Sequence, residues 1–174
     1  ADKAAADILA AGGAVHKPVA EIPGTGRFAV VGDPQGAGFG ILEPAPMEAG
    51  PPAGRAFDQK KAGHGNWNEL MTSDPAAAFG FYADLFGWGK SGAVDMGEMG
   101  AYQLFSHDGA DIGGMMGLGN SPVPAWLPYF GVNGIDAAIA RITAADGRLA
   151  HGPIEVPGGA FIAVAQDPAG AWFA

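Results

Sequence analysis

Residues 136–174 read DAAIARITAADGRLAHGPIEVPGGAFIAVAQDPAGAWFA, and residues 2–40 repeat this stretch without a gap. The two copies lie 134 positions apart and are identical at 17 of 39 positions. The identities include the DP-x-G-A run that begins at Asp33 and at Asp167. Alanine bias alone does not produce such a gapless register, so the chain contains at least two copies of one structural unit.

The C-terminal copy has the pattern of a helix followed by strands. Ile139 and Ile142 lie at helical spacing behind Asp136, which is a predicted N-cap. Gly147 suits the end of that helix. Residues 126–132 (WLPYFGV) precede the helix and predict a strand. Strands separated by turns rich in glycine and proline are predicted at residues 148–150, 160–165 and 171–174.

A weaker copy lies upstream, at an offset of 62 positions that places Asp74 on Asp136. Residues 67–72 (WNELMT) predict a strand, and Asp74 caps a predicted helix over residues 76–86. Further strands are predicted at residues 101–105 and 111–116. This segment therefore also has the order of a βαβββ module.

The predicted domain organisation has three parts. Residues 64–174 form one domain of two βαβββ modules, at about 64–120 and 121–174. Residues 1–43 hold only the C-terminal part of a further module, and residues 44–63, rich in proline and glycine, form an exposed linker. A piece of about 40 residues rarely buries enough surface to fold alone. Either the chain is part of a longer protein, or another chain completes the partial module.

Composition excludes several classes of protein. Eighteen acidic against nine basic residues give a net charge of −9, which argues against nucleic-acid binding. No apolar run approaches the roughly 20 residues that cross a bilayer, and no signal-peptide pattern opens the sequence. We therefore expect no membrane partner and a cytoplasmic location. The absence of cysteine excludes disulfides, thiolate metal sites and cysteine nucleophiles.

These motifs resemble the vicinal oxygen chelate superfamily, which includes glyoxalase I, bleomycin-resistance proteins and extradiol dioxygenases. The matching runs are DPAAAFGFYADLFGW at residues 74–88, GGMM at 113–116, WLPYF at 126–130 and the DP-x-G ending. The sequence is similar to tandem-domain bacterial members described as glyoxalase-like. The resemblance implies an α+β fold in which paired βαβββ modules form an open curled β-barrel with flanking helices around a cavity.

Metal-dependent members of the superfamily carry ligands on the first and last strands of each module. The resemblance places these positions on side chains that cannot bind a metal, namely Trp67, Gly113, Leu127 and Ala174, with Gly40 in the partial copy. A divalent site needs several converging nitrogen or oxygen ligands. We therefore expect no metal and no other cofactor in this domain.

Strand alternation assigns side chains to the implied cavity. Glu69 shares its face with Trp67 and Met71, and pseudo-symmetry places Tyr129 opposite Glu69. An unpaired carboxylate is costly there, so we expect Glu69 to bond the Tyr129 hydroxyl or to have a raised pKa. Either Glu69 is a general base or ligand anchor, or it bonds a neighbour such as Asn68 and stabilises the barrel floor. The candidate catalytic residue is Glu69, and the candidate ligand-binding residues are Trp67, Met71, Tyr102, Tyr129, His151 and Trp172.

Three functions are compatible with this pattern. The leading prediction is a metal-free protein that binds a small apolar or aromatic molecule between the modules, where Gly113 and Gly114 open room. The alternative is a metal-dependent glyoxalase-like lyase or dioxygenase whose active site lies in the incomplete first domain. The third is a domain with a vestigial cavity. The expected partner is a small-molecule ligand, and a homodimer stays open.

Overall fold

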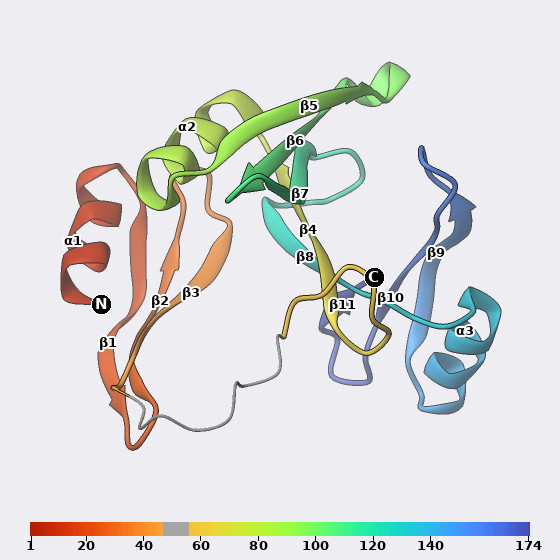
Figure 1. Cartoon of the computed structure of the whole chain (residues 1–174), viewed down its shortest axis with the longest axis horizontal. Coiled ribbons are helices and arrows are strands. Elements are labelled where there is room, and N and C mark those ends of the chain that lie inside the picture. The colour runs from red at the N-terminus through yellow and green to blue at the C-terminus, as the bar shows by residue number, and fades with distance from the viewer. Residues whose placement is uncertain (47–55) are drawn as a thin grey trace. The chain divides into compact units, whose positions relative to one another are not determined.

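A computed structural model describes residues 1–46 and 56–174 of the chain (Figure 1). Residues 47–55 of the predicted linker lie outside the described residues. The described elements are, in chain order, α1 (Asp2–Ala10), β1 (Ala14–Ile22), β2 (Gly26–Gly32), β3 (Gly38–Pro44), β4 (Gly65–Thr72), α2 (Pro75–Phe86), β5 (Gly89–Asp95), a 3₁₀ turn (Gly97–Met99), β6 (Ala101–His107), β7 (Ala110–Gly117), β8 (Ala125–Phe130), α3 (Ile135–Ala144), β9 (Arg148–Glu155), β10 (Phe161–Gln166) and β11 (Trp172–Phe173). The predicted α+β fold, with helices flanking open sheets, is confirmed.

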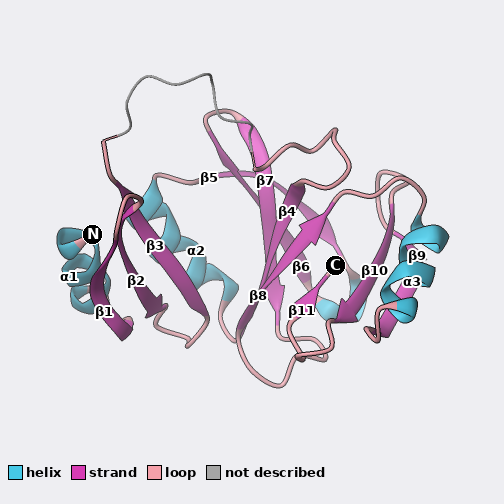
Figure 2. Ribbon diagram, turned by 90° about the horizontal axis from the view of Figure 1, so that it is seen from below, coloured by secondary structure: helices cyan, strands magenta, loops and turns pink. Residues whose placement is uncertain are grey.

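The strands form three sheets within the described residues. Their orders are β1-β2-β3, β9-β10-β11 and β5-β6-β7-β4-β8. The chain divides into two compact units, of which unit 1 combines Ala1–Ala53 with Glu69–Trp126 and unit 2 combines Gly54–Asn68 with Leu127–Ala174. In unit 1, α1 lies along the sheet β1-β2-β3, and in unit 2, α3 lies along β9 and β10 (Figure 2).

The element order matches the predicted modules, with local differences. β5 was absent from the sequence prediction because its residues, GKSGAVD, are nearly all exposed and lack an alternating apolar pattern. The prediction of Asp136 as an N-cap was wrong, because the N-cap of α3 is Gly134, two residues earlier, and the helix begins at Ile135. Asp136 lies instead in the first turn of α3, where its negative charge interacts favourably with the positive end of the helix dipole.

The end of the predicted linker is hydrogen-bonded into unit 2. Phe57 forms a parallel bridge with Gly65, and the Asp58 amide donates to the Gly65 carbonyl at 2.9 Å. The Gly63 amide donates to the Gly131 carbonyl at 2.8 Å. Residues 56–63 are therefore hydrogen-bonded to the first residue of β4, Gly65, and to Gly131, which follows β8. Most of their side chains are nevertheless exposed.

Helix α2 has strong signals at both ends. The Asp74 carboxylate accepts hydrogen bonds from the amides of Ala76 and Ala77, at 3.1 and 3.0 Å, and Pro75 occupies the first turn. Gly87 ends the helix with a left-handed backbone at φ 71°. These local signals explain why the sequence alone identified this helix.

Gly80 is an exposed glycine inside α2, and a Cβ added there meets no atom within 4 Å. We expect Gly80→Ala to raise the free energy of unfolding by about 0.5–1 kcal/mol, because alanine loses less backbone entropy in a helix. Urea unfolding of the full chain measures this change. The matched control is Gly87→Ala, which forces a Cβ onto the left-handed residue and should destabilise. Stabilisation by both variants would contradict the argument.

The two DP-x-G turns are built alike. In the first, Asp33 Oδ1 accepts from the amides of Gln35 and Ala37, at 3.0 and 2.8 Å. In the second, Asp167 Oδ1 accepts from the amides of Ala169 and Ala171, at 2.9 and 2.8 Å. The aspartate side chain fixes each turn through the backbone, as Asx turns do.

The core of unit 1 lies between the sheets and their helices. Leu70 and Thr72 of β4, Phe105 of β6 and Met115 of β7 are all 0% exposed. Tyr82 of α2 packs at the centre of a group of rings that comprises Phe39, Phe81, Phe86, Trp88 and Trp126. Since side chains alternate along a strand, the residues between these core positions lie on the opposite face of the sheet.

Candidate functional site

Glu69 lies on the face of β4 that points away from the core. Its neighbour Leu70 is fully buried in the core, so alternation places Glu69 and Met71 on the other face. Both of these side chains are half-buried. The predicted division of β4 into a core face and a second face therefore agrees with the observed burial.

The Tyr102 hydroxyl donates a hydrogen bond to Glu69 Oε2 at 3.0 Å, in a partly buried setting. Tyr102 lies near the start of β6, and Leu104 of that strand pairs with Gly114 of β7. Paired residues of antiparallel strands share a face, so Tyr102, Leu104 and Gly114 lie on the same side as Glu69. Tyr102 is one of the predicted cavity residues, whereas the predicted hydroxyl partner of Glu69 is Tyr129.

Gly114 makes room for the Tyr102 ring. A Cβ on Gly114 would lie 2.1 Å from Cε1 and 2.3 Å from Cζ of that ring. Real Cβ atoms do not approach other atoms this closely, so only a glycine can lie directly under the Tyr102 ring. In this position the Tyr102 hydroxyl reaches Glu69. The Tyr102 ring itself fills the space over Gly114, so the expectation that this glycine opens room for a ligand stays a prediction.

We refer to the outward side of β4, β6 and β7 in unit 1 as the Glu69 face. Its side chains are those of Glu69, Met71, Tyr102, Leu104 and Met116. Met116 belongs to it because its neighbour Met115 is fully buried on the core side. The face thus presents one carboxylate and one phenol among flexible apolar side chains, an arrangement suited to holding or deprotonating a small organic molecule.

The remaining candidate residues lie in unit 2. Trp67 is half-buried at the start of β4, and Tyr129 of β8 is 9% exposed. His151 is exposed on β9, where it pairs with Val164, and Trp172 of β11 is 49% exposed. The proposed pairing of Glu69 with Tyr129 joins residues of the two units and stays a prediction.

The ligand positions inferred from metal-dependent relatives hold no metal-binding side chain. Only backbone atoms could coordinate a metal at these positions, which are Trp67, Gly113, Leu127, Ala174 and Gly40. Across the described residues, 1–46 and 56–174, no group of three or more histidines and carboxylates could hold a metal ion. The donor set does not fit the divalent centre of metal-dependent relatives.

A buried hydrogen-bond network that no pattern in the sequence predicted lies elsewhere in unit 1. The Trp126 indole N–H donates to the Tyr82 hydroxyl at 2.9 Å, and that hydroxyl donates to Asp33 Oδ2 at 3.0 Å. Asp33 is 3% exposed and Tyr82 is 1% exposed. The network joins the first DP-x-G turn to α2 and β8, residues too far apart in sequence for a local pattern to reveal.

The network predicts an alkaline loss of stability. Burial raises the pKa of the Tyr82 hydroxyl well above its usual range, and the neighbouring Asp33 charge adds to that rise. The unfolded chain loses this proton near pH 10, whereas the folded chain keeps it. Stability is therefore fully present below pH 10 and falls above it by about 1.4 kcal/mol per pH unit. In urea unfolding between pH 9 and 11, Tyr82→Phe should remove this dependence. An unchanged pH profile in the variant would contradict the assignment.

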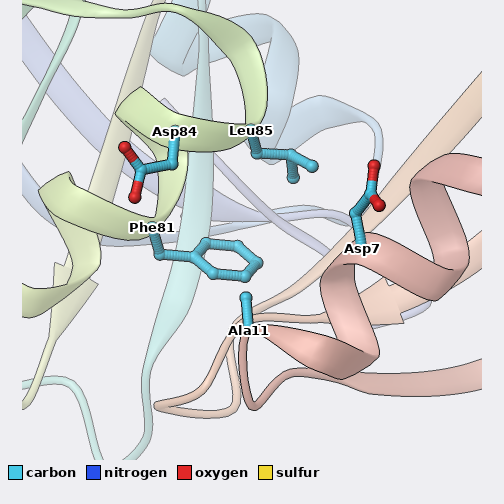
Figure 3. A pocket seen from close by; sticks show the side chains of 5 residues that line it. All are labelled: Asp7, Ala11, Phe81, Asp84 and Leu85. Atoms are coloured by element: carbon cyan, nitrogen blue, oxygen red, sulfur yellow. The ribbon is translucent and has the colours of Figure 1, made fainter.

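A hollow of about 190 Å³ lies between α1 and α2 within unit 1 (Figure 3). Its lining combines two carboxylates with apolar side chains, from Asp7, Ala11, Phe81, Asp84 and Leu85. The Asp7 carboxylate is bound by Lys3 at 2.6 Å on the exposed side of α1. None of the residues that line the hollow belongs to the Glu69 face.

The fold and the sequence match together identify the family of this protein. Residues 64–174 match the Glyoxalase/Bleomycin resistance protein/Dioxygenase superfamily, and the chain belongs to that family, within the vicinal oxygen chelate superfamily. In the described part of the chain, no helix combines the length and apolar character needed to span a bilayer.

Curated relatives include “Putative glyoxylase CFP32” of Mycobacterium tuberculosis, which is 31% identical over 170 residues. That match covers 95% of this chain and 61% of the relative, so the chain spans about three fifths of the relative's length. “Anthracycline biosynthesis protein DnrV” of Streptomyces peucetius is 36% identical over 123 residues, covering 62% of this chain and 44% of that protein.

Among solved structures, the 2,3-dioxygenase LapB from Pseudomonas sp. KL28 has a similar fold, with a TM-score of 0.58. The comparison covers 99% of this chain and 65% of that chain at 15% sequence identity. At this identity the similarity shows the fold alone.

Proposed function

We propose that this protein binds a small apolar or aromatic molecule on the Glu69 face, without a metal ion. The observation that carries the proposal is the partly buried hydrogen bond from Tyr102 to Glu69, held over Gly114. An apolar surface with a few precisely placed polar groups is the usual composition of a small-molecule site. Glu69 anchors the ligand and, if a reaction follows, is the group positioned to take a proton.

The relatives support an aromatic ligand. One of them is named for anthracycline biosynthesis, and anthracyclines are fused-ring aromatic compounds. Methionine side chains such as Met71 and Met116 adapt to flat rings, because they are unbranched and polarisable. The metal-free part of the proposal rests on the side chains at the inferred ligand positions, none of which can coordinate a metal.

The test is a titration of the full chain, labelled with ¹³C at the methionine methyl groups, with 2-naphthol. We expect the Met71 and Met116 signals to shift and the signal of Met99 to stay, because Met99 is an exposed residue of the 3₁₀ turn. Met115 is the control for the core side of the same strand. Absence of any shift, or equal shifts at Met99, would contradict the proposal. Binding that disappears after metal chelation would contradict its metal-free part.

The second candidate is a metal-dependent glyoxalase-like lyase or dioxygenase whose active site lies in the domain to which residues 1–43 belong. The name of the mycobacterial relative, and its greater length, favour this candidate. Its test is turnover of a methylglyoxal–thiol adduct or a catechol by the full chain with added divalent metal. Turnover that Glu69→Gln leaves unchanged would place the activity away from the Glu69 face.

A further inference from the structure

The edges of the sheets differ in how they are protected from further pairing. The β11 edge is bonded to β8, because the Ala174 amide donates to the Pro128 carbonyl at 3.0 Å and the Phe130 amide donates to the Ala174 carbonyl at 2.8 Å. The edge strands β1, β5 and β9 each contain a register shift, and β1 and β9 also contain a proline. Bulges and prolines are common devices that prevent an edge strand from pairing with another chain.

β3 is the outer strand of the sheet β1-β2-β3 and lacks these devices over residues 38–42, GFGIL (Figure 2). Its register with β2 is unbroken, and this stretch contains no charged residue and no proline. Within the described ranges, 1–46 and 56–174, no strand pairs with the outer edge of β3. Gly38, Gly40 and Leu42 are exposed there. The edge is therefore open as well as unprotected.

The backbone groups of Gly40 point toward this outer edge. At the turn between the strands, the Asp33 amide donates to the Ala37 carbonyl at 3.0 Å. Hydrogen-bonded pairs alternate along antiparallel strands, and the register places Gly40 opposite Val30, three pairs further on. This pair therefore falls between two hydrogen-bonded pairs. The N–H and C=O groups of Gly40 point away from β2.

The internal repeat contains a bonded counterpart of Gly40. At the offset of 134 positions, Gly40 corresponds to Ala174. Ala174 bonds β8 through both of its backbone groups, at Pro128 and Phe130, which is the pattern of a parallel pair. β8 is the strand that leads into α3, and β4, which leads into α2, likewise lies beside β7. In both modules that have a leading strand, this strand is thus bonded to the last strand of its module.

We propose that the outer edge of β3 binds a parallel β-strand at Gly40, and that this strand is a segment of a longer protein that precedes α1. It gives the helix α1 the leading strand that α2 and α3 have. The mycobacterial relative supports this occupant, because the matched region covers 61% of that protein and leaves further chain in it. The added strand also covers part of Leu42, an apolar side chain that is 56% exposed.

The experiment adds a copy of residues 125–134 directly before Ala1 of the full chain. These residues hold β8 and its connection to α3, and Ala1 corresponds to Ile135 in the repeat. We expect hydrogen exchange at the Gly40 amide to slow about tenfold or more, because the amide gains an acceptor. The amides of β1, at the opposite edge of the sheet, should exchange at unchanged rates.

A matched extension tests the pairing itself. Phe130→Pro within the added copy removes the N–H group that bonds the counterpart of Gly40, so this extension should protect Gly40 much less. Equal protection by the two extensions, or no protection by either, would overturn the proposal. Protection of Gly40 in the unextended chain, together with sedimentation as a dimer, would assign the edge to a second copy and overturn the proposed occupant.

A variant of β3 supplies a second measurement. Gly40→Pro removes the outward N–H group and no hydrogen bond with β2, and Pro44 shows that this strand already holds a proline. The unchanged extension should raise the Tm of the original chain by about 2–4 °C and leave that of Gly40→Pro nearly unchanged. An equal rise in both would overturn the proposal. The exchange experiment decides the proposal even if Gly40→Pro does not fold.

Discussion

Replacing Asp33 with alanine is expected to lower the free energy of unfolding of unit 1 by about 3–5 kcal/mol. The Asp33 carboxylate is 3% exposed and accepts hydrogen bonds from Gln35, Ala37 and Tyr82. Its removal leaves two backbone N–H groups and the Tyr82 hydroxyl without their acceptor. Native-state hydrogen exchange at the amides of β2 and β3 measures the loss, because these strands flank the turn.

Asp167→Ala is the internal control for this prediction. Asp167 makes the same two backbone hydrogen bonds in the second DP-x-G turn but lies in a more exposed position. We expect a loss of about 1–2 kcal/mol, read from the amides of β9 and β10. The difference between the two losses of unfolding free energy measures the contribution of the burial of Asp33 and of its hydrogen bond with Tyr82. Equal losses in both units would show that the network adds nothing beyond the turn.

Gly114→Ala should destabilise unit 1. It should also break the hydrogen bond between Tyr102 and Glu69 on the Glu69 face. The new Cβ would lie 2.1 Å from Tyr102 Cε1, so the ring must move and its hydrogen bond with Glu69 must break. Overpacking of this kind costs about 1–3 kcal/mol. We expect the affinity for 2-naphthol to fall about tenfold or more, through the lost anchor. Urea unfolding and probe titration measure the two effects.

Two comparisons isolate the contact between Gly114 and Tyr102. Gly117→Ala lies in the same strand, and its added Cβ meets no atom within 4 Å, so this variant should be nearly silent. In a Tyr102→Ala background the obstruction is gone, and Gly114→Ala should then cost little. If Gly114→Ala remains as costly in that background, the strain comes from the backbone and not from the ring.

Local signals account for the parts of the fold that the sequence predicted well. Asp74, Pro75 and Gly87 mark the ends of α2 by chemistry that acts within a few residues. The DP-x-G turns act in the same way. β5 lacks such signals, because an exposed edge strand needs no apolar alternation, and only its pairing with β6 shows it.

The candidate site shows where such reasoning reaches its limit. Alternation along β4 placed Glu69 and Met71 on the face opposite the buried Leu70, in agreement with the burial pattern. The partner of Glu69 is decided by which strands become neighbours, and Tyr102 lies 33 residues away on β6. The bond between Asp33 and Tyr82 spans 49 residues and depends on packing between two modules. Contacts of this range leave no periodic pattern in the sequence.

The two units are interleaved along the chain, since each is built from two separate ranges. A cut between residues 53 and 54 separates the two ranges of unit 1, and a cut between 126 and 127 separates those of unit 2. No single truncation point yields both units whole, and dissection at the sequence-predicted boundary near residue 64 divides both of them. A ribosome must also release Trp126 before the Tyr82 network of unit 1 can close. The N-terminal segment therefore completes this network only after the chain has been synthesised as far as Trp126.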